Sequence, residues 1–541
     1  MPNYYLTSPI YYVNDKPHIG HAYTTLACDA LARFKRLDGY DVKFLTGTDE
    51  HGEKVAKSAS EKGMEPQSFT DQVSQSFRNL SGQLNFSNDD FIRTTESRHK
   101  KACQIFWQKL VDGGHIYLGK YAGWYAIRDE SYYAESELVD GKAPTGAPVE
   151  WVEEPSYFFR LSAFQKPLLA HYKKHPEFVA PTTRMNEVKS FVEGGLNDLS
   201  VSRTSFSWGV PVPNDDKHIM YVWLEALVSY ITAAGYDGKT GKAGTADWQK
   251  YWPADLHMVG KDILRFHAVY WPAFLMAAGV GLPKRVCAHG WWTNEGQKIS
   301  KSLGNVIDPL ELVARYGLDQ MRYFLLREVP FGNDGDFSHR AMTDRMNNDL
   351  ANDLGNLAQR VLAIVHRHCQ ATMPQRPKAT TAADKQLLDG AYALLASHRQ
   401  HYDRQQFHSA LIETWQVVAA ANRYVDAMQP WALQKTDGQR MAAVLWVVCE
   451  VGRVVAILLQ PIMPDACGRL LDQLGVEAGG DAGAGGGGKG AGSGGSGKGA
   501  GAGKADGGAR DFGEVSAERA MAGGQEIGKP QAVFPRFEGA G

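Results

Sequence analysis

Residues 4–13 are mostly apolar, many of them aromatic or β-branched, and this run predicts a buried strand. A turn-forming sequence follows at 14–17, and from His18 to about Arg36 the apolar residues recur at helical spacing. A second strand is predicted at 41–45, with a loop at 46–52. A strand, a turn and a helix in this order open a nucleotide-binding α/β fold, whose ligands lie beyond the C-terminal ends of the parallel strands. Both loops are therefore expected at a substrate site.

Residues 115–215 differ from the segments on either side, because they are rich in tyrosine, tryptophan, proline and glutamate. The α/β pattern resumes near 219–223 and again at 257–260. We interpret 115–215 as a connective insertion that splits a Rossmann-like parallel sheet into two halves, residues 1–114 and 216–290.

The C-terminal part of the chain is predicted to be an all-α helix bundle over 347–475, because apolar residues recur at helical spacing almost throughout. Its most apolar stretch, 442–459, carries Glu450 and Arg453. These charges favour a buried bundle helix over a membrane span, so no membrane association is expected.

Three further segments complete the organisation. Residues 291–346 join the sheet to the bundle and carry a lysine-rich loop. Residues 476–511 are nearly all glycine, alanine, serine, lysine and aspartate, which predicts a flexible loop, since such a sequence buries little apolar surface. The tail, 512–541, regains apolar residues at 533–537 and is expected to pack back onto the body of the protein.

Composition sets limits on the function. The 541 residues contain 43% hydrophobic and 22% charged residues, which is typical of a globular enzyme. The net charge of −2 excludes a global basic surface for nucleic acid, so any RNA contact depends on local patches. The six cysteines are scattered, which indicates reduced thiols in the cytoplasm and no zinc-knuckle spacing. The N-terminus has no basic start followed by an apolar run, so no signal peptide is expected.

The first candidate for chemistry is the sequence His18-Ile19-Gly20-His21 at the start of the first predicted helix. Both histidine rings lie on one helix face, where the helix N-terminus adds backbone N–H donors for an anion. Gly20 leaves room for a nucleotide to approach the backbone. Such a turn is suited to hold the phosphates of ATP while a carboxylate attacks the α-phosphorus and pyrophosphate leaves.

The second candidate is the loop Lys298-Ile299-Ser300-Lys301-Ser302. Lys298 and Lys301 are suited to hold the leaving phosphates as point charges, and Ser300 and Ser302 add hydroxyl donors. Glycines at 296 and 304 would let the loop close on ATP. Together the two motifs predict adenylate formation, with the histidine turn and the lysine loop on opposite ends of one ATP.

These two motifs match the signatures of class I aminoacyl-tRNA synthetases. Four further segments resemble the methionyl-tRNA synthetases within that class, and the resemblance covers residues 1 to about 475 and the Phe-Pro-Arg tail. The segments are Thr7-Ser8-Pro9-Ile10-Tyr11-Tyr12-Val13-Asn14, Thr46-Gly47-Thr48-Asp49-Glu50-His51-Gly52, Tyr221-Val222-Trp223-Leu224-Glu225-Ala226 and Gly260-Lys261-Asp262-Ile263-Leu264-Arg265-Phe266-His267.

The resemblance implies a methionine–tRNA ligase that forms methionyl-adenylate and pyrophosphate, then transfers methionine to the 3′ end of tRNA(Met). It implies a methionine pocket lined by Ile10, Tyr12, Asp49, Trp223, Ala226, Tyr230, Ile263 and His267, with Asp49 on the α-ammonium. It places Lys261 and Asp262 near ATP, and it implies that 291–346 contacts the tRNA stem. In the bundle it implies anticodon reading by Asn356, Arg360 and Trp431, residue types that stack on or hydrogen-bond unstacked bases.

The sequence departs from the family in the insertion. Many members carry zinc knuckles of paired cysteines there, whereas residues 123–130 here contain no cysteine. We therefore predict no structural zinc and no other protein-held metal, while Mg²⁺ is expected with ATP. A monomer is expected, because no dimerising domain follows the bundle.

Three alternatives remain at this level. The first is a class I synthetase for leucine, valine, isoleucine or cysteine. The branched-chain enzymes need a large editing insertion that this length scarcely allows, and the cysteine enzyme needs zinc ligands. The second is a nucleotidylyltransferase, in which the helix bundle has no role. The third is a non-catalytic tRNA-binding paralogue, against which His18, His21 and Lys301 argue.

Overall fold

The computed structural model describes the 541 residues except 14–15, 130, 134, 300–303, 478–509 and 539–541. The chain divides into two compact units, and each is described by itself. The sheet unit comprises residues 3–28 and 42–291. The helical unit comprises residues 1–2, 29–41 and 292–541.

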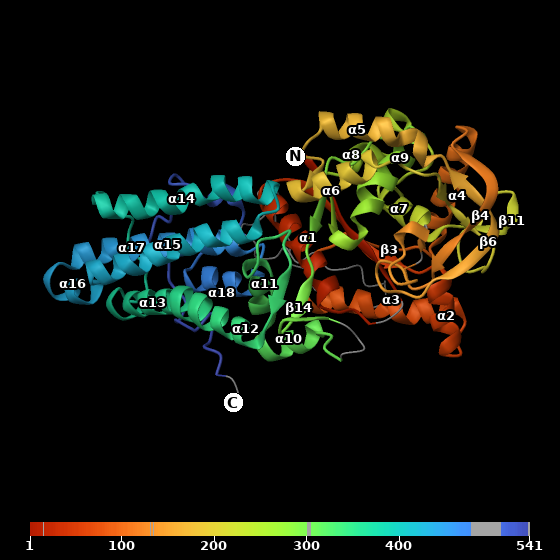
Figure 1. The fold of residues 1–541 in the computed structure, drawn as a ribbon. Coiled ribbons are helices and arrows are strands. Elements are labelled where there is room, and N and C mark those ends of the chain that lie inside the picture. Colours follow the sequence, from red (N-terminus) through yellow and green to blue (C-terminus); the bar gives the residue numbers. More distant parts are fainter. Residues whose placement is uncertain (14–15, 130, 134, 300–303, 478–509, 539–541) are drawn as a thin grey trace, which may run out of the picture. The chain divides into compact units, whose positions relative to one another are not determined.

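A six-stranded sheet forms the centre of the sheet unit, in the order β3-β2-β1-β12-β13-β7 (Figure 1). Its strands are β1 (Asn3–Tyr12), β2 (Asp41–Asp49), β3 (Asp90–Arg93), β7 (Val179–Ala180), β12 (Leu256–Gly260) and β13 (Val286–His289). Strands β1 and β12 pair in parallel with Leu6 opposite Leu256. The strand order reverses at this pair, and a reversal of this kind is where open α/β sheets bind their ligands.

Helices surround this sheet, and their apolar faces pack with it in a large core and in a smaller second cluster that includes Tyr11 and Val13. The helices are α1 (Ile19–Leu37), α2 (Glu53–Glu61), α3 (Pro66–Gln83), α4 (Ser97–Asp112), α5 (Gln165–Lys174), α6 (Thr182–Glu193), α7 (Val222–Ala233), α8 (Ala246–Tyr251) and α9 (Trp271–Ala277). The core contains Trp107, Trp271 and Tyr230, all fully buried. Helix α7 is buried along almost its whole length, which explains why its sequence is apolar on all sides.

Most strands of the segment 115–215 form a separate antiparallel sheet of β4 (Ile116–Ala126), β5 (Ser131–Tyr133), β6 (Glu150–Phe159) and β8 (Leu199–Ser200). Strand β7 of the same segment instead joins the parallel sheet beside β13. Strands β4 and β6 form a long ribbon from the pair Ile116–Phe159 to the pair Tyr125–Glu150. A small three-stranded sheet follows, made of β9 (Ser202–Arg203), β10 (Pro211–Val212) and β11 (Asp215–Met220). The parallel sheet split by an insertion, with a helical domain after it, confirms the predicted fold class.

Two local predictions were wrong. The segment 219–223 does not return the chain to the parallel sheet, because Ile219 and Met220 pair antiparallel with Arg203 and Ser202. The expected loop at 46–52 begins only after Asp49, because Leu45–Thr48 pair with Asp90–Arg93 and extend β2. Gly47 permits this close pairing, since a Cβ there would lie 2.1 Å from the carbonyl oxygen of Ile92.

The helical unit is a bundle of helices, and Figure 1 shows α14, α15 and α17 side by side. The helices are α10 (Pro309–Tyr316), α11 (Leu318–Arg327), α12 (His339–Arg345), α13 (Asn356–His368), α14 (Ala382–Asp403), α15 (Phe407–Met428), α16 (Pro430–Thr436), α17 (Gly438–Leu459) and α18 (Pro464–Gln473). A three-stranded sheet, in the order β15-β14-β16, belongs to the same unit: β14 (Trp292–Asn294), β15 (Gln297–Lys298) and β16 (Gly335–Phe337).

Helix α17 is the one described helix whose length and hydropathy would suffice to cross a membrane, and 83% of its apolar window is buried inside the protein. Two of its charged residues are buried as an ion pair, with Arg453 Nη2 2.6 Å from Glu450 Oε1. Tyr392 donates a further hydrogen bond to the same Glu450 oxygen. A helix with such partners on its neighbours is a core helix of the bundle.

The C-terminal half of α1, residues 29–37, packs in the helical unit. Arg322 Nη2 lies 2.6 Å from Asp29 Oδ2, with both side chains fully buried, and its guanidinium also donates to the carbonyls of Pro461 and Ile462. Phe34 stacks on Tyr402 at a ring distance of 3.9 Å. These contacts attach the helix firmly to α11, α14 and the turn before α18.

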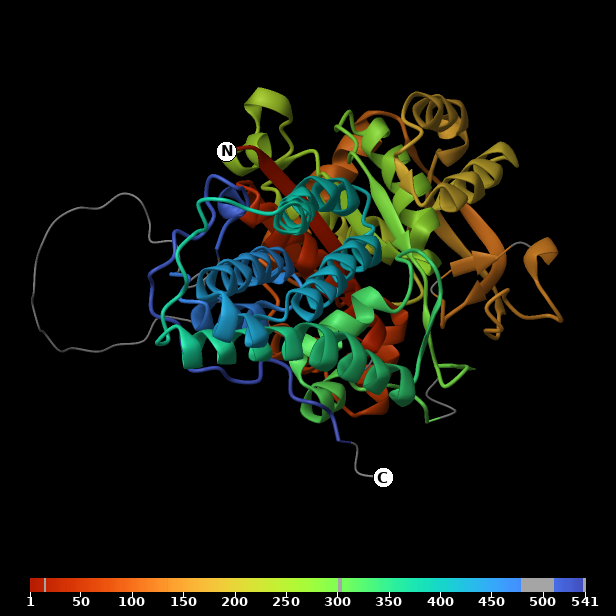
Figure 2. The same cartoon turned by 90° about the vertical axis from the view of Figure 1, so that its left-hand side faces the viewer.

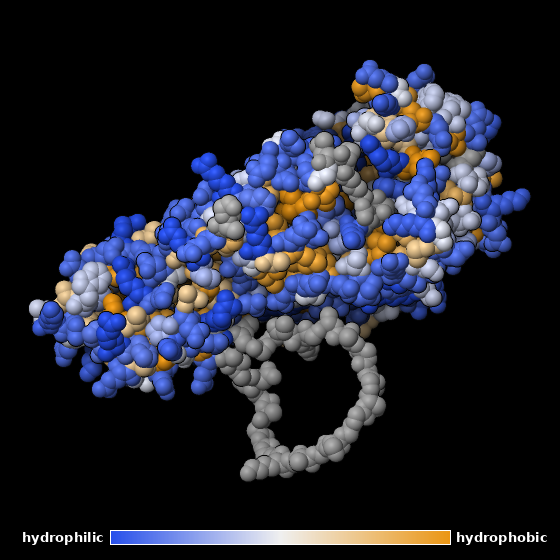
Figure 3. Space-filling model, turned by 90° about the horizontal axis from the view of Figure 1, so that it is seen from below, coloured by the Kyte–Doolittle hydropathy of each residue, from blue (hydrophilic) through white to orange (hydrophobic). Residues whose placement is uncertain are grey.

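The tail after the Gly-rich segment returns to the helical unit, which Figure 2 views from the side of α16. Val533 and Phe534 are buried, and Phe537 N donates to Asn347 Oδ1 at 2.8 Å. On the face of the molecule seen in Figure 3, hydrophilic residues predominate and apolar residues gather in small patches.

Candidate active site

The histidine turn follows β1 directly, at the switch point of the sheet. His18 precedes the first helical residue, and its Nδ1 accepts the backbone N–H of Gly20 at 3.1 Å. His21 Nδ1 accepts the backbone N–H of His18 at 3.1 Å, and the two rings lie 3.9 Å apart. Because each Nδ1 is an acceptor, each neutral ring carries its hydrogen on Nε2. The backbone thus sets both histidines as Nε2–H donors.

Gly20 has a steric role in this arrangement. A Cβ at this position would lie 3.0 Å from Cε1 and 3.1 Å from Nδ1 of His18, so a larger residue would push the ring from its place.

Most of the predicted site residues meet in one cavity of about 430 Å³ in the sheet unit. The residues that line it and were predicted from the sequence are Ile10, Tyr12, His18, Gly20, His21, Asp49, Trp223, Ala226, Tyr230, Asp262, Ile263 and His267. They come from β1, the turn after it, the first turn of α1, the end of β2, α7 and the segment after β12. Lys261 lies beside this lining, with its Nζ 4.4 Å from the centre of the Trp291 ring.

A buried hydrogen-bonded pair closes one part of the cavity. Tyr230 Oη lies 2.7 Å from His267 Nε2, and His267 Nδ1 lies 2.9 Å from the carbonyl oxygen of Ile263. A carbonyl only accepts, so Nδ1 carries the hydrogen and Nε2 accepts the Tyr230 hydroxyl hydrogen. Burial lowers the pKa of His267 to about 4, which keeps this ring neutral. The Tyr230 oxygen therefore presents lone pairs, and no hydrogen, to any further partner.

Aromatic rings supply much of the remaining wall. Trp223 stacks on Phe266 at 3.7 Å with an interplanar angle of 9°, a partner that the sequence analysis missed. Lys54 lies 5.4 Å above the Tyr12 ring and also lines the cavity, as does Arg128 from the insertion. Asp49, the last residue of β2, is buried and lines the same wall of the cavity.

Asp262 is held in place at the other part of the cavity. Its Oδ1 accepts Trp291 Nε1–H at 3.1 Å. Gly260 is required beside it, because a Cβ on Gly260 would lie 2.4 Å from that same oxygen. The glycine of the Gly-Lys-Asp sequence therefore reflects a packing constraint.

Two cavity residues that the sequence analysis missed are Thr24 and His289. Thr24 lies one helical turn after Gly20, a spacing that could have drawn attention to it. His289 ends β13, and its Nε2 lies 2.7 Å from Thr24 Oγ1. Nothing in the local sequence links residues 265 positions apart, so this pair is visible only in the folded sheet.

The lysine loop belongs to the helical unit. Lys298 ends β15 and is exposed, while Ser300, Lys301 and Ser302 lie outside the described residues. Asn305 Nδ2 donates to the carbonyl of Lys298 at 3.1 Å, and Asn294 Nδ2 donates to the carbonyl of Asn305 at 3.0 Å. These bonds fix the two ends of the loop to each other. Gly296 and Gly304 both have positive φ, 77° and 64°, as a tight loop base requires.

The predicted anticodon residues lie together on the bundle. Asn356 and Arg360 lie one turn apart on α13, and the Arg360 guanidinium is 5.8 Å from the centre of the Trp431 ring. Trp431, at the start of α16, is 43% exposed, so its ring face is accessible to a base. Arg360 also pairs with Asp426 at 3.0 Å.

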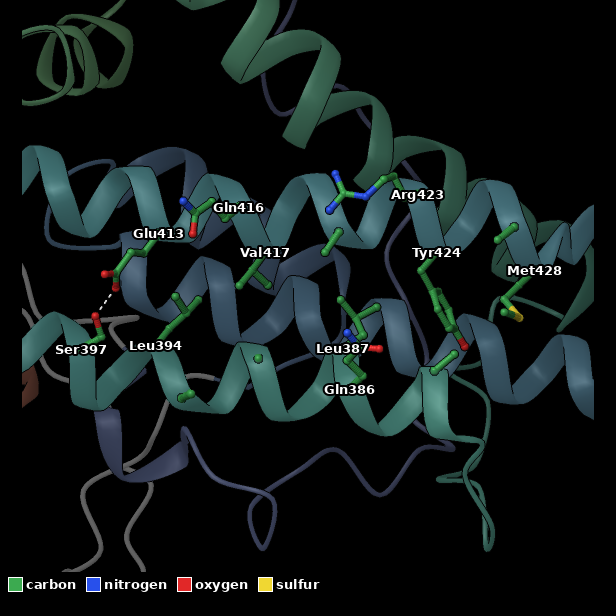
Figure 4. Close-up of a pocket in the computed structure, with 15 residues that line it drawn as sticks. Gln386, Leu387, Leu394, Ser397, Glu413, Gln416, Val417, Arg423, Tyr424 and Met428 are labelled. Carbon is green, nitrogen blue, oxygen red and sulfur yellow. Dashed lines mark hydrogen bonds between the residues drawn. The ribbon is translucent and has the colours of Figure 1, made fainter.

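A larger groove of about 590 Å³ lies between α14 and α15 (Figure 4). Its lining includes Leu387, Leu394, Val417 and Tyr424, with the hydrogen-bonded pair Ser397–Glu413 toward one end. It contains none of the residues predicted to bind a substrate or an anticodon.

Metal-binding groups were also considered. Among the described residues no cluster of three or more histidine, cysteine, aspartate or glutamate side chains is arranged to hold a metal ion. All six cysteines are free thiols.

Comparisons with known proteins give this geometry a class. The family described as "tRNA synthetases class I (M)" matches residues 4–150 and 137–362, and "Anticodon binding domain of methionyl tRNA ligase" matches 373–481. A parallel sheet with a histidine turn at its switch point, followed by this bundle, thus defines a class I aminoacyl-tRNA synthetase.

Relatives that match over the whole chain identify the family within this class. The methionine–tRNA ligase of Rickettsia felis is 52% identical over 539 residues and covers 99% of both chains, and that of Brucella suis is 53% identical over 99% of this chain and 98% of its own. The solved structure of Mycobacterium tuberculosis methionyl-tRNA synthetase in complex with methionyl-adenylate has a TM-score of 0.90 at 47% identity, covering 99% of this chain and 100% of that chain. The chain belongs to the methionyl-tRNA synthetase family, and it is a methionine–tRNA ligase.

Proposed function

We propose that the cavity at the switch point is where L-methionine and ATP react to give methionyl-adenylate and pyrophosphate. The observation that carries this proposal is the convergence of the histidine turn, Asp49, the Tyr230–His267 pair and Asp262 on one cavity of about 430 Å³. A cavity of this size suits a small amino acid together with part of a nucleotide. The solved relative named above is in complex with methionyl-adenylate, which supports the same product.

In the proposed reaction, the methionine carboxylate attacks the α-phosphorus, and the bond to pyrophosphate breaks. His18 and His21 donate from Nε2 to phosphate oxygens, because the backbone holds both rings in that tautomer. Lys298, Ser300, Lys301 and Ser302 hold the leaving phosphates, and Mg²⁺ accompanies ATP to offset its charge. Gly20, Lys261 and Asp262 contact the nucleoside or phosphates.

Methionine is proposed to lie between Tyr12, Trp223 and the Tyr230–His267 pair, with Ile10, Ala226 and Ile263 completing the apolar wall. The α-ammonium binds Asp49 through a charge-assisted hydrogen bond. The Tyr230 hydroxyl hydrogen is already committed to His267 Nε2. The thioether, a weak acceptor, is therefore recognised by shape and by contact with aromatic rings.

The reaction and its specificity are tested by pyrophosphate exchange into ATP with each of the twenty amino acids. Methionine alone is expected to support exchange, because a branched side chain would clash within the aromatic walls and a shorter one would leave them unfilled. Exchange with leucine, isoleucine or valine at a rate comparable to methionine would contradict the proposed pocket.

After activation, methionine is transferred to the 3′ end of tRNA(Met), and the bundle reads the anticodon through Asn356, Arg360 and Trp431. We expect Trp431→Ala to raise KM for tRNA, by an amount equivalent to about 1–3 kcal/mol for the loss of one stacked base. Pyrophosphate exchange should stay near wild type, because it needs no tRNA.

The control for this variant is Ile412→Ala, which removes another exposed apolar side chain from the same helical unit. It should leave both assays unchanged. Equal losses in aminoacylation and in exchange for Trp431→Ala would assign the tryptophan to folding instead.

We further propose that the enzyme acts as a cytoplasmic monomer without structural zinc. The free state of all six cysteines supports a reducing compartment. In the insertion, at the place where zinc knuckles occur in other members, Arg128 Nη2 donates to the Thr145 carbonyl at 2.7 Å and Tyr133 donates to Asp129 at 3.1 Å. This side-chain network ties the segment together without a metal.

A further inference from the structure

A buried histidine at the end of β13 is linked to the histidine turn. His289 Nδ1 lies 2.8 Å from the carbonyl oxygen of Gly290, and its Nε2 lies 2.7 Å from Thr24 Oγ1. Thr24 Oγ1 also lies 3.0 Å from the carbonyl oxygen of Gly20, one helical turn back on α1. His289, Thr24 and Gly20 all line the cavity that contains His18 and His21.

Counting hydrogens shows that all three contacts are hydrogen bonds at once only when the ring is protonated. The Gly290 carbonyl only accepts, so His289 Nδ1 carries a hydrogen. If the ring is neutral, Nε2 is an acceptor and takes the single hydroxyl hydrogen of Thr24. If the ring is protonated, Nε2–H donates to Thr24 Oγ1, and the hydroxyl hydrogen is released to the Gly20 carbonyl. The protonated ring therefore allows all three hydrogen bonds, whereas the neutral ring leaves the Gly20 carbonyl without the Thr24 hydrogen.

The surroundings of His289 favour the neutral ring in the cavity as it stands. Burial lowers the pKa of His289, while the hydrogen bond to Gly290 and the nearby carboxylate of Asp262 oppose that shift. The edge of the Tyr23 ring, 5.1 Å away on α1, packs against the imidazole. The other titratable groups on this cavity are Asp49, Lys54, Arg128, Asp129, Tyr11, Tyr12, Tyr230, His18, His21 and His267. An anionic phosphate entering the same cavity would favour a positive charge on His289.

We propose that His289 is a positioning residue for the histidine turn. Binding of a nucleoside triphosphate is coupled to uptake of one proton by His289. The protonated ring then turns the Thr24 hydroxyl hydrogen toward the Gly20 carbonyl. The one bond that forms is Nε2–H of His289, and its proton comes from solvent. The switch acts on the backbone carbonyl of Gly20, which lies between His18 and His21. It rests on the proposed location of ATP in this cavity.

Proton uptake is the direct test. The full-length enzyme is titrated with the α,β-methylene analogue of ATP and Mg²⁺ at pH 7.5, by calorimetry in buffers of different ionisation enthalpy. We expect the wild-type enzyme to take up as much as about one proton per molecule of analogue bound. The His289→Asn variant should lose that uptake and still bind the analogue. Equal uptake in the two proteins would overturn the proposal, since His18 or His21 would then be the source.

Two variants of Thr24 separate positioning from folding. Thr24→Val removes the hydroxyl at nearly constant volume, and we expect kcat for methionine-dependent exchange to fall about tenfold, with KM for methionine unchanged. Thr24→Ser keeps the hydroxyl and should rescue the rate. The acid limb of the pH profile should shift in Thr24→Val and stay in place in Thr24→Ser.

The outcomes distinguish this inference from the proposed function. Absence of methionine-dependent exchange in wild type would contradict the proposed function itself. An active wild type with Thr24→Val and Thr24→Ser at the same rate and pH profile would overturn the inference about His289 alone. Circular dichroism and thermal unfolding of each variant identify any loss that comes from misfolding.

Discussion

Replacing Lys301 with alanine is expected to lower kcat for methionyl-adenylate formation by about 2–4 kcal/mol of transition-state stabilisation, with KM for methionine little changed. The reason is that negative charge grows on the leaving pyrophosphate as its bond to the α-phosphorus breaks. A fixed ammonium near those oxygens stabilises the transition state more than the ground state. Methionine binds at the other end of the reacting system, so its affinity does not depend on this lysine.

Single-turnover formation of methionyl-adenylate measures this effect. Gln297→Ala is the matched control, because Gln297 is exposed on β15 immediately before the loop and carries no charge. It should retain the wild-type rate. A raised KM for methionine at normal kcat would assign Lys301 to amino-acid binding. Wild-type kinetics in Lys301→Ala would contradict the proposed pairing of the lysine loop with the histidine turn on one ATP.

The second large effect concerns the stability of the helical unit. Asp319 on α11 is 5% exposed, and its Oδ2 accepts the backbone N–H of Ala466 in the first turn of α18 at 2.6 Å. Burial raises the pKa of this carboxyl to about 6, although Ala466 and Arg322 oppose the shift. The folded protein therefore holds a proton on Asp319 at pH values where the unfolded chain has released it.

The sign of the pH dependence follows from that difference. Between about pH 4 and pH 6 the folded state binds more protons than the unfolded state, so this group makes the free energy of unfolding fall as pH rises. Asp319→Asn removes the titration. The free energy of unfolding of the variant, relative to wild type, should therefore increase from pH 4 to pH 6 by about 2 kcal/mol and level off above pH 6.

Denaturant unfolding followed by circular dichroism between pH 4 and pH 8 checks this expectation. Asp308→Asn makes the same chemical change at the exposed start of α10, where Asp308 Oδ1 accepts the N–H of Leu310, and it provides the baseline. A difference between Asp319→Asn and wild type that stays constant with pH would show that burial of this carboxylate costs the folded state little.

The hydrophobic pattern predicted the fold class because strands and helices have different periods and because glycine and proline mark their ends. It was least informative where pairing partners decide the outcome. The segment 46–49 contains a glycine that suggests a loop, yet it is strand because β3 lies close enough to pair with it. Residues 219–220 have the composition of a buried parallel strand but pair antiparallel with β9, since the insertion provides the nearer partner.

The candidate site shows the same division. Motifs with fixed local spacing, such as His18 and His21 or Trp223 and Tyr230, could be identified in the sequence, because one turn or one helix places their members. Phe266 against Trp223, Trp291 against Asp262, and His289 against Thr24 could not, because each pair joins separate elements. The protonation states depend on these same partners.

The sequence by itself determined which chemical groups the chain carries: two motifs predicted to bind phosphate, an anticodon-type bundle and an insertion without cysteine. The tertiary structure decided how those groups are prepared. It orients both histidines of the turn as Nε2–H donors and commits the Tyr230 hydroxyl hydrogen to His267. It also places His289 within hydrogen-bonding distance of Thr24. The physical reason is that residue type follows from the chain, whereas the direction of each hydrogen bond depends on which donors and acceptors folding brings within 3 Å or so of one another.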